Sequence, residues 1–141
     1  MVPKLSITQY LAAYVAALLT LVVGDYFWIG SLMADFYNSR LGSIMLTQPR
    51  LGAAGVFYLL YIFGLMFFGV RPGIAAQSWR VTAGHCALFG LIAYGTYDLS
   101  NLATLKNWFV DLTVVDMAWG CLISAAAGSA AYAVSRALAP K

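Results

Sequence analysis

Four long runs without a charged residue constrain this chain more than any other feature of its sequence. The runs are 17 to 20 residues long and cover residues 5–24, 51–70, 81–97 and 117–135. A helix needs roughly 20 residues to cross a hydrocarbon core about 30 Å thick, and backbone groups cannot stay unpaired in lipid. The runs therefore predict an all-α integral membrane protein, a bundle of four transmembrane helices.

The composition agrees with this fold class. Of the 141 residues, 62% are hydrophobic and 9% are charged, whereas soluble domains carry about a quarter charged residues. The apolar run after Lys4 continues past Asp25 without a small-residue cleavage site, which favours a transmembrane helix over a cleaved signal peptide. We expect a single membrane domain over residues 1–141, with helices at approximately 7–33, 51–70, 81–98 and 109–137.

Lysines and arginines predict the orientation, because cytoplasmic loops carry an excess of them. Five lie toward the N-terminus, the second loop and the C-terminus, and three lie on the other side. The larger set is Lys4, Arg71, Arg80, Arg136 and Lys141, and the smaller is Arg40, Arg50 and Lys106. This difference places the N- and C-termini in the cytoplasm. All five acids are aspartates, and all then lie toward the outer side: Asp25, Asp35, Asp98, Asp111 and Asp116.

The first outer loop has a helical pattern of its own. Tyr37, Leu41, Ile44 and Met45 recur at helical spacing, while polar residues occupy the other face. Such a pattern is typical of a short helix that lies in the membrane interface. We expect this interfacial helix to end near Pro49.

An aspartate precedes a tryptophan by one helical turn twice in the chain, at Asp25–Trp28 and at Asp116–Trp119. Apolar residues flank both acids, so both are embedded in their helices, and Asp98 falls at the same predicted level. Ionisable groups within membrane helices are costly and are functional hypotheses by default. The pattern predicts a polar, aromatic pocket in the outer leaflet. The alternative is that the acids face headgroup water and the indoles form an ordinary aromatic belt.

We expect a ligand-binding site at this pocket, formed by Asp25, Trp28, Arg40, Tyr94, Tyr97, Asp98, Asn101, Asp116 and Trp119. No lysine or arginine lies within the four uncharged runs, so the acids need protonation, a basic loop residue or a bound cation. Arg40 is the internal partner that we expect, and Lys106 is a second choice. The indoles either donate N–H hydrogen bonds or offer their ring faces to a cation.

The remaining small and polar residues of the helices indicate packing. His85 is expected to be packed and hydrogen-bonded, and Cys86 and Cys121 to be small packing residues. One histidine and two cysteines are too few ligands for a zinc site, so we expect no metal and no cofactor. A spacing of four places small residues on one face of the fourth helix, as close helix packing in lipid requires: Gly120, Ser124 and Gly128.

The stretches GDYFWIG, FYNSRLG, YGTYDLSNLATLKNW and VDMAWG extend over nearly the whole chain. Together they resemble a family of small bacterial four-helix membrane proteins catalogued as domain of unknown function 2177. The resemblance implies a bacterial inner-membrane location and no particular activity. It implies these motif positions: Asp25, Trp28, Gly30, Arg40, Leu41, Gly42, Tyr94, Gly95, Tyr97, Asp98, Asn101, Leu102, Asp116, Trp119 and Gly120.

Three classes of function stay open. The first is a binding or transport protein that captures a cation, a proton or a lipid-like cationic ligand at the outer pocket. The second is a lipid-modifying enzyme with an aspartate as general acid or base. The third is an assembly partner that docks through the small residues of the fourth helix.

Ligand binding is favoured among the three. Four helices make a small transport path unless the protein forms a homodimer, and the sequence shows no nucleophile–base pair. Membrane lipids are the expected partners. The net charge of +3 is spread over short loops and indicates no nucleic-acid partner.

Overall fold

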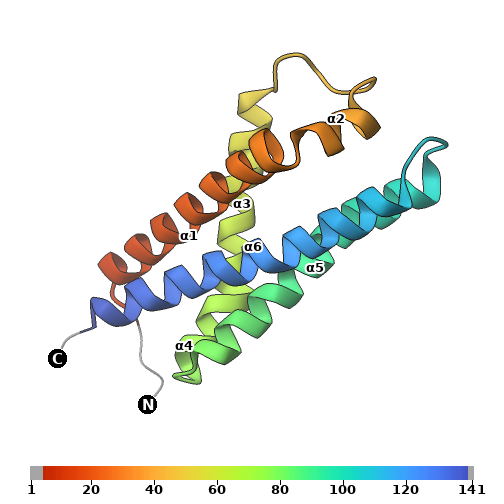
Figure 1. Ribbon diagram of the computed structural model, residues 1–141. Helices are drawn as coiled ribbons and strands as arrows, with labels where there is room; N and C mark the ends of the chain where they lie inside the picture. The colour runs from red at the N-terminus through yellow and green to blue at the C-terminus, as the bar shows by residue number, and fades with distance from the viewer. Residues whose placement is uncertain (1–4, 140–141) are drawn as a thin grey trace.

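The structure, a computed structural model, describes residues 5–139, and most of this range is helical, with no strand in it. The first half contains α1 (Ile7–Phe27), the π-helical η1 (Trp28–Leu32), α2 (Ala34–Leu41) and α3 (Leu51–Leu65). The second half contains the π-helical η2 (Met66–Val70), α4 (Arg71–Ala75), α5 (Trp79–Thr104) and α6 (Val110–Ala137). The predicted all-α class is confirmed. Figure 1 shows that α1 begins and α6 ends at one end of the molecule, whereas α2 lies at the other.

Three continuous helical segments are long and apolar enough to cross a membrane. They are Ile7–Leu32 with 26 residues, Leu51–Ala75 with 25 and Val110–Ala137 with 28. The predicted third helix lies within α5, which has 26 residues but is not one of these three. Its histidine, glycines, threonines and tyrosines, together with Asp98, lower its mean hydropathy.

A stripe of buried residues at every fourth position joins α1 to α6. The stripe consists of Gln9, Ala13, Ala17, Leu21 and Asp25. Residues four apart lie on the same face of a helix, and the alanines allow the helices to approach closely. At one end of the stripe the Gln9 side chain donates to the backbone carbonyl of Ser135. Asp25 is buried because it is the last member of the face that α1 presents to α6.

Small residues also join α5 to α6. A Cβ atom on Gly90 would overlap the Gly120 carbonyl oxygen and the Ser124 side chain. Cys86 is buried, and its side chain fills the space beside Gly128. The interpretation of the small-residue spacing as a packing feature is confirmed, and so is that of Cys86. Cys121 is half-buried, and both thiols are free.

Two local expectations are wrong. The short helix after the first predicted span ends at Leu41 rather than near Pro49, because the chain turns directly after Gly42, where Ile44 N–H bonds to the Leu41 carbonyl. His85 is exposed on α5 instead of packed within the bundle. Its position in the sequence shows only that it lies inside an apolar run, not which face of the helix it occupies.

Candidate functional site

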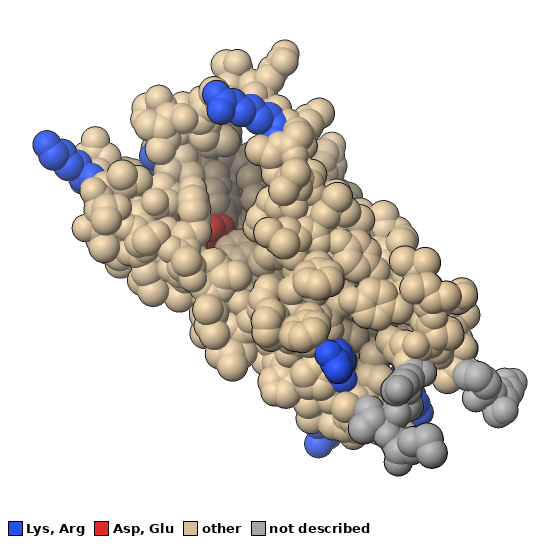
Figure 2. Space-filling model, turned by 180° about the vertical axis from the view of Figure 1, so that it is seen from behind, with Lys and Arg blue, Asp and Glu red and all other residues tan. Residues whose placement is uncertain are grey.

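Three aspartates from three helices gather at the end of the molecule that holds α2. Asp25 comes from α1, Asp98 from α5 and Asp116 from α6. The Asp98 carboxyl lies within hydrogen-bonding reach of the Asp116 carboxyl, and the Asp116 charge also acts on Asp25. Figure 2 shows a hollow in the surface at this end, with an acidic side chain at its floor and basic side chains at its rim. The three acids that the sequence places at one level are thus neighbours in space.

Asp25 has a hydrogen-bond donor on each of its carboxylate oxygens. Trp119 donates its indole N–H to Oδ1 at 2.9 Å, and Tyr58 donates its hydroxyl to Oδ2 at 2.9 Å. The aspartate is 6% exposed. Because its donors come from α6 and α3, Asp25 ties three helices together. A buried carboxylate with two donors is well satisfied, so its contacts indicate a structural contribution to the site.

Asp116 is linked to α2 through a tyrosine. The buried Tyr37 donates its hydroxyl to Asp116 Oδ1 at 2.6 Å, and Trp28 donates its indole N–H to the same hydroxyl at 3.2 Å. Burial, and after it the bond to Asp116, raises the pKa of the Tyr37 hydroxyl above its ordinary value. Tyr37 therefore remains a hydrogen-bond donor over a wide pH range.

The two indoles of the repeated motif stack on each other. The Trp28 and Trp119 rings are 4.4 Å apart between centroids and 1° from parallel. Each ring covers a face of the other, and both N–H groups have acceptors. The sequence predicts that the indoles either donate N–H hydrogen bonds or offer their ring faces to a cation, and in the structure they donate hydrogen bonds.

Asp98 differs from the other two acids. It is 0% exposed, and neither of its carboxylate oxygens has a hydrogen-bond partner within residues 5–139. Buried polar atoms are nearly always paired, so this carboxyl group requires a physical explanation.

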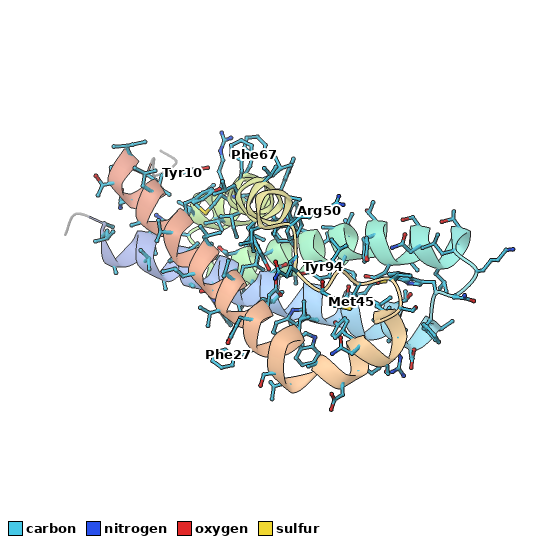
Figure 3. All side chains as sticks on the ribbon, turned by 90° about the horizontal axis from the view of Figure 1, so that it is seen from above. Tyr10, Phe27, Met45, Arg50, Phe67 and Tyr94 are labelled. Atoms are coloured by element: carbon cyan, nitrogen blue, oxygen red, sulfur yellow. The ribbon has the colours of Figure 1, made fainter. Side chains whose placement is uncertain are left out.

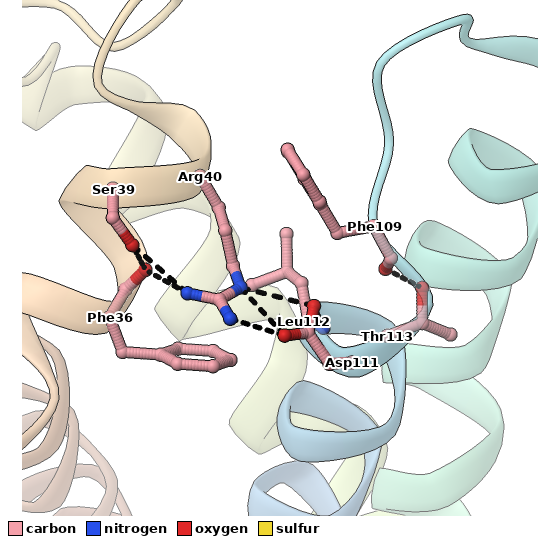
Figure 4. Close-up of polar contacts among 7 residues, drawn as sticks. All are labelled: Phe36, Ser39, Arg40, Phe109, Asp111, Leu112 and Thr113. Carbon is pink, nitrogen blue, oxygen red and sulfur yellow. Dashed lines mark hydrogen bonds and ion pairs between the residues drawn. The ribbon is translucent and has the colours of Figure 1, made fainter.

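Arg40 does not reach the buried acids. Its Nε lies 3.0 Å from both carboxylate oxygens of Asp111, and a guanidinium nitrogen pairs with the same carboxylate (Figure 4). Its guanidinium also lies over the Phe36 ring, 3.8 Å from the centroid. The Arg40–Asp111 pair is the one ion pair in the part of the chain that the structure describes. Since Arg40 sits in the last turn of α2, it meets the exposed start of α6 rather than the carboxylates further along that helix.

The other predicted site residues lie on α5. Tyr94 packs over Gly120 and meets the Tyr61 ring edge-on, at 6.2 Å between centroids. Figure 3 shows Tyr94 near the centre of the molecule as seen from above. Tyr97 is exposed and meets the Trp108 ring edge-on. Asn101 is half-buried.

A comparison with protein families identifies the family of this chain. The family described as Predicted membrane protein (DUF2177) matches residues 10–133, nearly the whole chain. The chain belongs to this family. No curated protein and no solved structure matches it. The expected resemblance is confirmed, and the family description together with the apolar helices makes this DUF2177 protein an integral membrane protein.

Sequence reasoning missed two tyrosines at the site of this DUF2177 protein. The sequence pattern places Tyr37 only on an apolar helix face and Tyr58 only within an apolar run, yet they donate to Asp116 and Asp25. One signal was available for Tyr58. A phenol hydroxyl deep in an apolar run needs a partner, and the buried acids are acceptors.

The Arg40–Asp111 pair is expected to hold α2 against α6. Replacing Arg40 with glutamine should speed amide hydrogen exchange in α2, and Asp111→Asn should have the same effect. The double variant should exchange no faster than either single variant, because one interaction is lost in all three. The difference should shrink at high salt, since both groups are accessible to ions. Exchange measured by mass spectrometry checks this, with Arg50→Gln as control. Additive effects would show that the two residues act separately.

Proposed function

We propose that this DUF2177 protein crosses the bacterial inner membrane four times, with both termini in the cytoplasm. Three segments qualify as spans by length and composition. As the fourth span we propose α5, because it is 26 residues long and packs along α6 through Gly90, Gly120 and Gly128. The excess of lysine and arginine on the side of the termini supports this orientation.

In this orientation the three aspartates belong to the outer leaflet, where the hollow binds a cationic or lipid-like amphiphile. The observation that carries the proposal is the uncompensated acidity of the site. Asp25, Asp98 and Asp116 lie together among aromatic side chains, while the one ion pair of residues 5–139 is formed by Arg40 and Asp111. Uncompensated buried charge is strongly unfavourable, so a cationic group is the natural complement of this site.

The assembly role is less well supported. The small residues of α6 that would form its docking face are already covered by α5. The lipid-modifying enzyme and the homodimer stay predictions.

The proposed function is tested by native mass spectrometry and lipid analysis of the purified protein. We expect a bound amphiphile on the wild type and on the control Asp35→Asn, which changes an exposed acid of α2. In Asp116→Asn, occupancy should fall by about tenfold, the cost of losing one hydrogen bond to a charged group. Asparagine can still accept the Tyr37 hydroxyl, so the fold is expected to persist. Equal occupancy in Asp116→Asn, or no adduct on the wild type, would contradict the proposal.

A further inference from the structure

We propose that Asp98 and Asp116 form a proton-binding site in which the two carboxyl groups share one proton. This inference goes beyond the proposed function, because it concerns the acids themselves and requires no molecule in the hollow. It assigns different roles to the three aspartates, with Asp25 outside the pair.

The first observation is the isolation of Asp98. Its side chain is 0% exposed, and both oxygens lack a donor within the described residues 5–139. An ionised carboxylate in such a place carries a large desolvation cost that no contact offsets. A protonated carboxyl group avoids this cost, because it is neutral and has an O–H to donate.

The second observation is the acceptor beside it. The Asp98 carboxyl lies within hydrogen-bonding reach of Asp116. Asp116 already accepts the Tyr37 hydroxyl on Oδ1 at 2.6 Å, and a carboxylate has about four lone-pair sites. It can therefore also accept an O–H from Asp98. Two carboxylates this close cannot both ionise without strong repulsion, and one shared proton removes the repulsion and pairs one of the two unpaired Asp98 oxygens.

Within residues 5–139, no side chain around the pair supplies a positive charge, so the shared proton is the charge that balances the two carboxyl groups. Tyr37 faces it from α2, and Tyr94 and Tyr97 face it from α5. Asp25 approaches from α1, but its oxygens already have donors in Trp119 and in Tyr58 of α3. None of these groups brings a positive charge. The result is a hydrogen-bonded chain that runs from Asp98 through Asp116 and Tyr37 to Trp28.

Infrared spectroscopy of the purified protein tests the site directly. At neutral pH the wild type should show the C=O stretch of one protonated carboxyl group. The band should be absent from Asp98→Asn, which removes the protonated group, and should shift in Asp116→Asn, because the Asp98 O–H then donates to an amide oxygen instead of a carboxylate. It should persist in Asp111→Asn, which changes an exposed acid at the start of α6. A wild type without the band, or a band that survives Asp98→Asn or stays unshifted in Asp116→Asn, would overturn the proposal.

The pH dependence of unfolding in detergent provides a second measurement. If the folded pair holds one proton that the unfolded chain has released, stability falls as the pH rises. The unfolding equilibrium constant should then increase by about tenfold per pH unit over that range. Asp98→Asn should remove this slope, whereas Asp111→Asn should keep it. An unchanged slope in Asp98→Asn would refute the shared proton even if that variant folds poorly. The absence of a bound amphiphile would contradict the proposed function and leave these two results unaffected.

Discussion

Replacing Gly90 with valine is expected to destabilise the protein by about 3 kcal/mol, the upper range for overpacking a close interface. Any Cβ at this position would overlap the Gly120 carbonyl oxygen and the Ser124 side chain. The backbone carbonyl cannot rotate away, so α5 has to move from α6. Since Asp98 and Asp116 sit on these two helices, the same displacement should separate the two carboxyl groups.

The matched control is Gly84→Val on the same helix, where a Cβ meets no atom within 4 Å. Both substitutions change helix propensity equally, so their difference isolates the clash with α6. Unfolding by denaturing detergent, followed by circular dichroism, measures the effect. Equal stability of the two variants would mean that the contact between α5 and α6 is looser than the structure shows.

Trp119→Ala is expected to cost about 4 kcal/mol, within the range for removal of a large aromatic side chain from a packed site. The substitution removes the indole stack with Trp28 and also takes a donor from the buried Asp25 carboxylate. A buried acceptor left without its donor contributes about 1 to 3 kcal/mol of such a loss.

Trp28→Ala is the comparison, because it abolishes the same stack and the bond to the Tyr37 hydroxyl but leaves the bond from Trp119 to Asp25 intact. We expect a clearly smaller loss of stability in this variant, measured by the same unfolding experiment. If both alanine variants unfold at the same denaturant concentration, the hydrogen bond to Asp25 stabilises the fold no more than the bond from Trp28 to Tyr37.

The repeated D-x-x-W motif shows which part of the site can be predicted from the sequence. Helix direction alone predicts that Asp25, Trp28, Asp116 and Trp119 face one another at one end of the bundle, and the structure brings them together. The hydrogen-bond partners of the two indoles do not follow from the spacing within each motif. Trp119 donates to Asp25, the acid of the other turn, whereas Trp28 reaches Asp116 only through Tyr37. These pairings depend on how α1 rotates against α6, which a motif within one helix does not encode.

The ion-pair partner of Arg40 is harder to predict from the sequence than the positions of the buried acids. The sequence predicts that Arg40 balances the buried acids, because Arg40 is a basic residue in the loop after the first predicted span. Its actual partner, Asp111, is an exposed acid at the start of α6. The choice depends on the end of α2 at Leu41, and helix ends are set by local turns that hydrophobic periodicity does not reveal.

The two donors to Asp25 have a consequence for biosynthesis. Tyr58 lies 33 residues after Asp25 in the chain, and Trp119 lies 94 residues after it. When α1 leaves the ribosome, neither α3 nor α6 has emerged, so α1 must enter the bilayer with a carboxyl group that no protein contact yet satisfies. Translation of α3 supplies one donor and translation of α6 the other. The contacts of Asp25 are therefore complete only after α6 has been translated.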